Sequence, residues 1–395
     1  MKRILKIVFL IITLLILLMA GYYIYQLYVV PKLTILDVPT LSYPRQSVFY
    51  RYYIQSNGLT VTFGGQNMPA SQVTTELEKD MKNIKSSGFD GVKLSYSFQG
   101  NNYLADRIAL RASQQGLYPI GMLQGYQAKP KDRAFTSEEM AEWQKFVRDE
   151  VSANKNTIYF WEIWNEPSLF RYGSPEEFVQ LLAATYPIIK EANPNAKVVV
   201  TLGAEGRDTS FEDKVLALGG GDYFDVLSFH PYGANPYLQE ELIKEAIAHE
   251  RLVVAKYNNR WPLVISEIGQ PASEVSEEEQ ARLATFLYAE AAKNKIPVTW
   301  FYWSDERLPK DEMTGDGANW GLIRFDGTER TILEAISITA QGSIKPTQIV
   351  TLRERSLRPK GLHLRKTEIL RTRKSAGCSH RPDVLRENDM VTELL

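Results

Sequence analysis

Two glutamates stand directly at the ends of runs rich in β-branched and aromatic residues. Glu166 follows the run TIYFWEIW and Asn165, and Glu267 lies within the run PLVISEI. Two carboxyl groups that face each other can hydrolyse a glycosidic bond: one protonates the leaving oxygen, and the other attacks the anomeric carbon or activates water. The alternative is a pair of structural carboxylates in an ion-pair network, which also perturbs such groups.

Seven apolar runs predict the strands that must position these glutamates. They lie at residues 91–98, 117–123, 157–164, 197–202, 224–229, 262–268 and 298–303. They recur about every 34 residues, close to the roughly 31 residues per unit of a (β/α)8 barrel. Their continuous apolar character is typical of parallel strands buried on both faces. The sequence therefore predicts an α/β fold, a (β/α)8 TIM barrel.

Helical patterns lie between these runs. Residues 104–115 predict one helix, Ser137 begins another with two glutamates in its first turn, and Ser174-Pro175 begins a third. We expect the remaining first strand within residues 49–63. A doubly wound open sheet is the alternative, but no Gly-rich phosphate-binding turn follows an early strand.

The position of the glutamates along the barrel indicates a shared site. If residues 91–98 form the second strand, Glu166 follows the fourth strand and Glu267 lies at the end of the seventh. In TIM-barrel enzymes the active site lies at the C-terminal ends of the strands. Both carboxyl groups are therefore expected at the barrel mouth.

The motifs WNEP at 164–167 and ISEIG at 265–269 resemble signatures of a large clan of retaining (β/α)8 glycoside hydrolases. This clan includes the family 5 cellulases and mannanases and the family 39 xylosidases. The resemblance covers roughly residues 50–340. It implies that Glu166 is the acid/base and Glu267 the nucleophile, and that Asn165 hydrogen-bonds the sugar 2-hydroxyl.

Further candidates for substrate binding come from the same resemblance. His230 and Tyr232 follow the run at 224–229 and are similar to a His-x-Tyr motif beside the nucleophile, although they could simply cap the barrel rim. Trp303, which ends the eighth strand, is similar to the tryptophan on which a sugar stacks, with an ordinary core tryptophan as the alternative. Trp320, in GANWGL, is a candidate platform on the leaving-group side.

Lys93 departs from the family 5 pattern. Family 5 enzymes usually have an arginine at the end of the second strand that braces the nucleophile, and Lys93 is the candidate here. A lysine supplies the charge without the two-pronged guanidinium. The departure favours family 39 or a neighbouring family.

The N-terminus carries a membrane signal. Residues 7–30 contain no charged residue, and Lys2, Arg3 and Lys6 precede them. A run of this length predicts a transmembrane helix with a cytoplasmic N-terminus and the rest of the chain outside. A cleaved signal peptide is the alternative. We therefore expect an anchor at 1–31, a linker at 32–46, the catalytic barrel at 47–344 and a tail at 345–395.

The tail differs in composition from the barrel. Residues 345–395 have no aromatic residue and hold 12 Lys and Arg against 6 Asp and Glu. This composition favours disorder or an added sequence. The alternative is a basic tail that contacts an anionic glycan, lipid or nucleic acid.

Composition and net charge exclude several classes of protein and of binding site. The net charge of -1 gives no global field that would indicate nucleic-acid binding. One cysteine, Cys378, excludes a disulfide scaffold and a cysteine-built zinc site. Four widely spaced histidines predict no metal-ligand cluster, so no metal or organic cofactor is expected. The sequence predicts a membrane-anchored retaining glycoside hydrolase acting on an extracytoplasmic glycan; a transglycosylase or a catalytically silent glycan-binding barrel are the alternatives.

Overall fold

The computed structural model describes residues 42–51, 54–56, 60–63, 66–125, 133–169, 172–204, 209–232, 239–305 and 319–340. Within them, parallel strands form a closed barrel in the order β1-β11-β10-β9-β8-β7-β6-β5. The barrel strands are β1 (Gln46–Phe49), β5 (Gly91–Ser97), β6 (Tyr118–Gln124), β7 (Phe160–Ile163), β8 (Lys197–Ala204), β9 (Val226–His230), β10 (Leu263–Ile268) and β11 (Val298–Phe301). β1 pairs with both β11 and β5, which closes the barrel and confirms the predicted fold.

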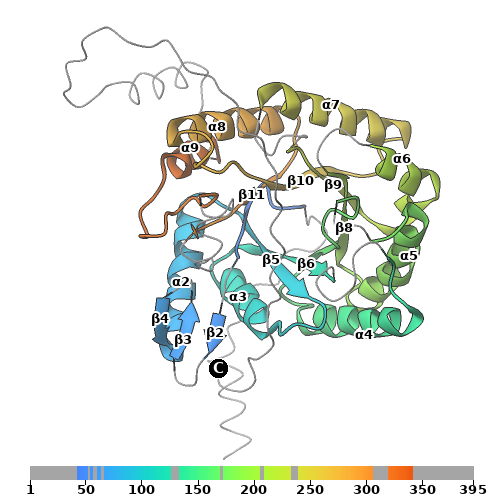
Figure 1. The fold of residues 1–395 in the computed structure, drawn as a ribbon, viewed down its shortest axis with the longest axis horizontal. Helices are drawn as coiled ribbons and strands as arrows, with labels where there is room; N and C mark the ends of the chain where they lie inside the picture. Colours follow the sequence, from blue (N-terminus) through green and yellow to red (C-terminus); the bar gives the residue numbers. More distant parts are fainter. Residues whose placement is uncertain are drawn as a thin grey trace, which may run out of the picture.

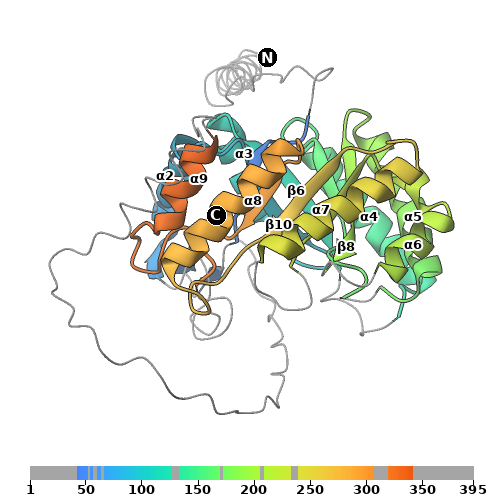
Figure 2. The same cartoon turned by 90° about the horizontal axis from the view of Figure 1, so that it is seen from above.

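A helix follows each barrel strand, and Figure 1 shows these helices as a ring around the strands, which Figure 2 shows from the side. They are α2 (Ala70–Ser86), α3 (Tyr103–Gln114), α4 (Ser137–Ala153), α5 (Pro175–Ala192), α6 (Ser210–Ala217), α7 (Glu240–Lys256), α8 (Glu277–Lys293) and α9 (Thr331–Ala340). Capping boxes at Thr136 and Ser174 begin α4 and α5, because each hydroxyl accepts a hydrogen bond from a backbone amide of the first turn. The predicted starts of these two helices are therefore confirmed.

The first strand lies earlier than the sequence predicts. β1 spans Gln46–Phe49, whereas the segment that follows it leads to a separate antiparallel sheet. That sheet consists of β2 (Ile54–Ser56), β3 (Thr60–Phe63) and β4 (Gln66–Pro69). All four side chains of β1 are buried, so it lacks the polar-apolar alternation by which a half-exposed strand is recognised.

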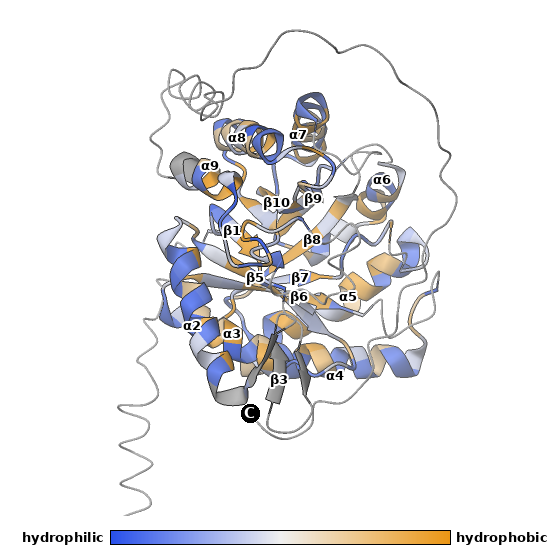
Figure 3. Ribbon diagram, turned by 60° about the vertical axis from the view of Figure 1, so that its left-hand side comes forward, coloured by the Kyte–Doolittle hydropathy of each residue, from blue (hydrophilic) through white to orange (hydrophobic). Residues whose placement is uncertain are grey.

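The barrel interior is layered. An apolar cluster that includes Phe160, Val199 and Val226 fills its lower part. Above it lie the buried polar side chains of Glu162, Thr201 and others. A much larger apolar core lies between strands and helices, and Figure 3 shows the strands predominantly hydrophobic and the helices two-sided. The buried polar groups thus lie above the apolar cluster, on the side of the C-terminal ends of the strands.

Among the described residues, no helix has the length and apolar character needed to cross a bilayer. The anchor expected at 1–31, most of the linker and the tail at 345–395, with Cys378, lie outside the described residues.

Candidate active site

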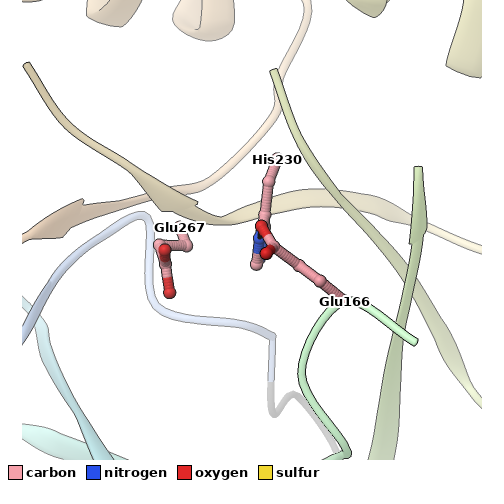
Figure 4. Close-up of side chains that lie close together, drawn as sticks. All are labelled: Glu166, His230 and Glu267. Atoms are coloured by element: carbon pink, nitrogen blue, oxygen red, sulfur yellow. Dashed lines mark hydrogen bonds and ion pairs between the residues drawn. The ribbon is translucent and has the colours of Figure 1, made fainter. Parts of the chain in front are cut away.

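The C-terminal ends of three strands bring three ionisable side chains together. Glu166 follows β7, His230 ends β9, and Glu267 lies near the end of β10. One oxygen of each glutamate and one ring nitrogen of His230 all lie within 4.8 Å of one another. Figure 4 shows Glu166 reaching towards His230, with Glu267 beside them. The two glutamates selected from the sequence thus share one site, as expected.

The turn that carries Glu166 has an unusual backbone. Trp164 and Glu166 have φ angles of 67° and 42°, in the left-handed region that residues other than glycine rarely adopt. Such conformations cost of order 1–3 kcal/mol and need support from their surroundings. Trp164 supplies it: its ring is fully buried and packs edge-on against Tyr172 at a centroid distance of 4.9 Å. This packing directs Asn165 and Glu166 into the mouth.

Asn165 has an unused acceptor at the site. Its side chain is buried, and its Oδ1 has no hydrogen-bond partner among the described residues. A buried carbonyl oxygen without a partner is costly, so a substrate hydroxyl would satisfy it. This position fits the predicted role of Asn165 in substrate binding.

His230 links the two halves of the site. Its Nδ1 lies 2.6 Å from Glu166 Oε1, and its Nε2 lies 3.0 Å from the Oγ of Ser266, the residue before Glu267. Burial acts to lower the pKa of His230, but the hydrogen bond and the charge of Glu166 outweigh it, and the pKa is raised. The imidazole thus fixes the orientation of Glu166 rather than lining open space.

A chain of buried polar groups continues below His230. Ser266 Oγ lies 3.1 Å from Glu162 Oε1, and Glu162 Oε2 lies 2.8 Å from Lys93 Nζ. The Lys93 ammonium also donates to the Ser266 carbonyl at 3.1 Å. Lys93 has no exposed surface, so its predicted place in substrate binding is wrong. It braces the strand of the nucleophile candidate from within the barrel.

Glu162 is a member of this chain that the sequence reasoning missed. The alternation of side chains along β7 could have identified it. In this strand Phe160 and Glu162 face the barrel interior, and Trp161 faces the helices. A carboxylate on the inward face of a barrel strand requires a cation, and Lys93 supplies it.

Glu267 is the carboxyl group whose pKa is most clearly perturbed at the mouth. Burial, with a further contribution from the charge of Glu166, raises its pKa to about 6, while His230 and Lys93 oppose the rise. Tyr232 donates a hydrogen bond to Glu267 Oε1 at 3.4 Å. Burial, followed by the charge of Glu267, holds the pKa of Tyr232 well above its usual range, so the phenol keeps its proton.

Aromatic side chains border the carboxylates. The ring of Trp320 lies edge-on to Tyr232 at 6.1 Å between centroids and to Phe301 at 5.7 Å. These rings pack with Phe49 and Tyr302 in one cluster at the mouth. Trp320 therefore lies next to Tyr232, the residue that contacts Glu267, and its role as a platform stays a prediction.

Trp303 lies in a different environment from the one expected. Its ring packs edge-on against Phe89 at 6.2 Å and belongs to the core between barrel and helices. β11 ends at Phe301, so the alternation of the strand no longer determines where Trp303 points. The core packing of Trp303 does not favour the sugar platform expected there, whereas Tyr302, Trp320 and the partly buried Phe301 form a separate aromatic cluster near Tyr232.

Residues 122–307 match the model of the cellulase family, glycosyl hydrolase family 5. No curated protein matches the chain. The match confirms the resemblance to glycoside hydrolases of this barrel type and the assignment of the chain as an enzyme that acts on glycosidic bonds.

Solved structures show the same fold at low sequence identity. A family 39 glycoside hydrolase from the gut symbiont Bacteroides cellulosilyticus WH2 matches with a TM-score of 0.60 and 18% identity, over 75% of this chain and 63% of that one. A GH5_18 variant from Streptomyces cattleya, in complex with Manβ1-4GlcNAc, matches with a TM-score of 0.59 and 17% identity, over 80% and 82%. An exo-β-1,4-mannosidase from Opitutaceae bacterium strain TAV5 matches at 0.53 and 12%, over 78% and 60%. The chain thus spans less than two thirds of the first and third proteins.

Proposed function

We propose that this glycoside hydrolase of the family 5 and family 39 type cleaves its substrate by double displacement, with retention at the anomeric carbon. The observation that carries the proposal is the separation of the carboxylates, because one oxygen of Glu166 lies within 4.8 Å of one oxygen of Glu267. Carboxyl groups are about 5–5.5 Å apart in retaining enzymes and about 6.5–9.5 Å apart in inverting ones.

In the first step Glu267 attacks the anomeric carbon. The glycosidic bond breaks, and Glu166 gives its proton to the leaving oxygen. In the second step Glu166 takes a proton from water, and the resulting hydroxide oxygen displaces Glu267. The sugar is released with its original configuration, and both carboxyl groups return to their starting states.

The neighbours of the carboxylates suit these roles. Tyr232 donates to Glu267 and favours its ionised form before attack. His230 holds Glu166 through a 2.6 Å contact, along which a proton can be shared. The unused Asn165 Oδ1 is positioned to accept a hydrogen bond from a sugar hydroxyl.

We propose a β-linked glycan as substrate. One support is the aromatic cluster beside the two carboxylates, since a flat ring packs well against the apolar face of a pyranose. Two proteins of similar fold are named with Manβ1-4GlcNAc and with β-1,4-mannosidase activity. Aryl β-mannosides, β-glucosides and β-xylosides are therefore the first substrates to compare.

Chemical rescue tests the assignment. With Glu267→Ala, aryl glycoside cleavage is expected to fall at least 10³-fold, and azide should restore it while giving the glycosyl azide of inverted configuration. With Glu166→Ala, azide should accelerate turnover of substrates with good leaving groups and give the retained product. The control is Glu278→Ala, which changes an exposed carboxylate on α8. Wild-type turnover in Glu267→Ala, or a product of inverted configuration from the wild-type enzyme, would overturn the mechanism.

We also propose that residues 1–31 anchor the enzyme in a membrane with the barrel on the extracytoplasmic side. The support is the uncharged run at 7–30 and the basic residues before it. Protease added to intact cells should then digest the barrel of the full-length protein, while carbonate washing should leave the undigested protein in the membrane fraction. Barrel protection in intact cells would exclude this orientation, and release by carbonate would exclude the anchor.

A further inference from the structure

A second cluster of histidine and carboxylates lies on the helices outside the barrel. Glu212 is in the first turn of α6, and His249 and Glu250 are in α7. One ligand atom from each of the three lies within 4.8 Å of the others. Wide spacing in the sequence predicts no such cluster, yet the fold brings residues 37 positions apart (212 and 249) to one place.

The two glutamates are buried, and most of the polar atoms of the cluster make no hydrogen bond. Glu212 has no exposed surface and Glu250 is 3% exposed, whereas the His249 side chain is 37% exposed. Both Glu212 oxygens, Glu250 Oε2 and His249 Nε2 lack a hydrogen bond among the described residues. An unpaired buried carboxylate carries an effective penalty of several kcal/mol. Burial and the charge of Glu212 hold the pKa of Glu250 well above its usual range, so one of the two facing carboxyl groups keeps a proton that a bound cation could replace.

No lysine or arginine of the described residues pairs with either glutamate. The ion pair recorded there joins His249 Nε2 to Glu212 Oε2 at 3.4 Å. This distance also fits two atoms that bind the same metal ion. Two ligands bound at about 2.1 Å to a tetrahedral ion lie about 3.4 Å apart.

We propose that Glu212, His249 and Glu250 form a binding site for a divalent transition-metal ion of the Zn²⁺ type. Two carboxylate oxygens and one imidazole nitrogen are donors that suit Zn²⁺, and two carboxylates balance its charge. A water molecule would be the fourth ligand, because the His249 side chain is 37% exposed and borders solvent. The site serves stability rather than the proposed glycosidic chemistry, because it lies outside the barrel wall.

Gly203 shows that the backbone makes room for this cluster. A Cβ atom at Gly203 would lie 2.2 Å from Glu250 Oε1 and 3.0 Å from Phe229 Cβ. The register between β8 and β9 also shifts between Thr201 and Gly203. The bound ion would therefore join α6 and α7 at the point where both approach the end of β8.

The test compares metal binding in the full chain after removal of metal with a chelator. Wild type is expected to bind one more equivalent of Zn²⁺ than His249→Gln and Glu250→Gln, and Zn²⁺ should raise its melting temperature by several degrees. Co²⁺ should give a visible absorption band that both variants lack. Glu241→Gln, an exposed carboxylate on the same helix, is the matched control and should behave as wild type.

The variants also separate metal loss from misfolding. In chelator Glu250→Gln should be about as stable as wild type, because the amide replaces a buried carboxyl group whose pKa is raised well above its usual range and which therefore holds a proton. His249→Gln retains both carboxylates and changes a partly exposed position. Equal Zn²⁺ stoichiometry and equal shifts in melting temperature in wild type and both variants would overturn the proposal, as would the absence of any Zn²⁺ effect. The Glu166, His230 and Glu267 group is intact in all of these proteins, so binding there cannot produce the difference.

Discussion

Glu267 experiences opposing influences that together set its protonation near neutral pH. Burial and the charge of Glu166 disfavour its ionised form, while His230 and Lys93 favour it. Tyr232 adds a hydrogen bond to the same carboxylate. The proposed nucleophile is thus ionised at neutral pH and yet only weakly stabilised, which suits a group that must give up its charge in forming a bond.

The first prediction concerns the acid side of the pH profile. Because attack requires ionised Glu267, kcat/KM should fall as the pH decreases through about 6. Tyr232→Phe removes a donor to the carboxylate and should move this fall to higher pH. The measurement is kcat/KM from pH 4 to 9, with Tyr186→Phe, a part-buried tyrosine that contacts Asp225 on the outer layer, as control. An acid limb unchanged by Tyr232→Phe would contradict the assigned hydrogen bond.

The second prediction concerns stability. A carboxyl group with a raised pKa in the folded state contributes stability below its unfolded pKa and loses it as the pH rises through the folded value. A rise from 4.5 to about 6 corresponds to about 2 kcal/mol. The free energy of unfolding of Glu267→Gln, relative to that of wild type, should therefore be about 2 kcal/mol higher at pH 8 than at pH 4. Urea unfolding at both pH values measures this, and Glu278→Gln should show no such pH dependence.

At the level of residues, it was easier to predict which residues form the site than to predict where each side chain points. Glu166 and Glu267 were identifiable because polar groups that end apolar strands must meet at the barrel mouth. Lys93 was placed at the correct strand, but the sequence does not show that Glu162 lies near enough to bury it. The orientation of Trp303 was not predictable, because this residue lies beyond the last residue of its strand. Glu212 and His249 meet only through tertiary packing, for which neither segment carries a signal.

At the level of elements, one short segment holds Trp320 at the mouth. Asp305, after β11, accepts a hydrogen bond from Gly321 N at 2.8 Å and pairs with Arg330 at 2.7 Å. Arg330 also donates to the Gly321 carbonyl at 2.6 Å. Both charged side chains are almost fully buried. They fix the backbone on either side of Gly321 and thereby the adjacent tryptophan.

The third prediction is that this segment acts on substrate binding. Trp320→Ala should raise KM about tenfold with a smaller change in kcat, because it removes a stacking surface worth roughly 1–2 kcal/mol. Asp305→Ala should raise KM similarly and also lower the melting temperature, since it leaves Arg330 buried without its partner. Asp326→Ala, which changes an exposed turn aspartate in the same segment, is the control. An unchanged KM in both variants would exclude Trp320 from the substrate site.

Helices and strands whose own residues carry a recognisable pattern were predictable, whereas β1, which lacks one, was not. The helices beginning at Ser137 and Pro175 have side-chain caps that act within four residues, and the sequence located both. β1 has four residues buried on both faces and no local signal, so its position is set by pairing with β5 and β11. The first strand was instead expected within residues 49–63, most of which lead into the small β2-β3-β4 sheet.

At the level of the whole molecule, the barrel interior changes in character from one end to the other. Its lower part is apolar, its middle holds the Lys93–Glu162 ion pair, and its mouth holds the carboxylates. The ion pair connects β5 to β7, and its hydrogen bonds through Ser266 reach β10 and His230. The middle layer thus ties the position of the reacting groups to the closure of the barrel.

The fourth prediction separates the two contributions of this layer. Lys93→Met should destabilise the protein by about 3–5 kcal/mol, because Glu162 is left buried without its cation. The double variant Lys93→Met with Glu162→Met should recover most of that stability, because no uncompensated charge remains. The double variant should not recover turnover. Ser266 has lost its contacts with Glu162 and with the Lys93 ammonium, so it no longer holds His230 in a fixed position. Urea unfolding and kcat/KM are measured on the same preparations. A double variant as unstable as the single one would mean that the ion pair is needed for folding, whereas one with full activity would mean that the middle layer does not position the site.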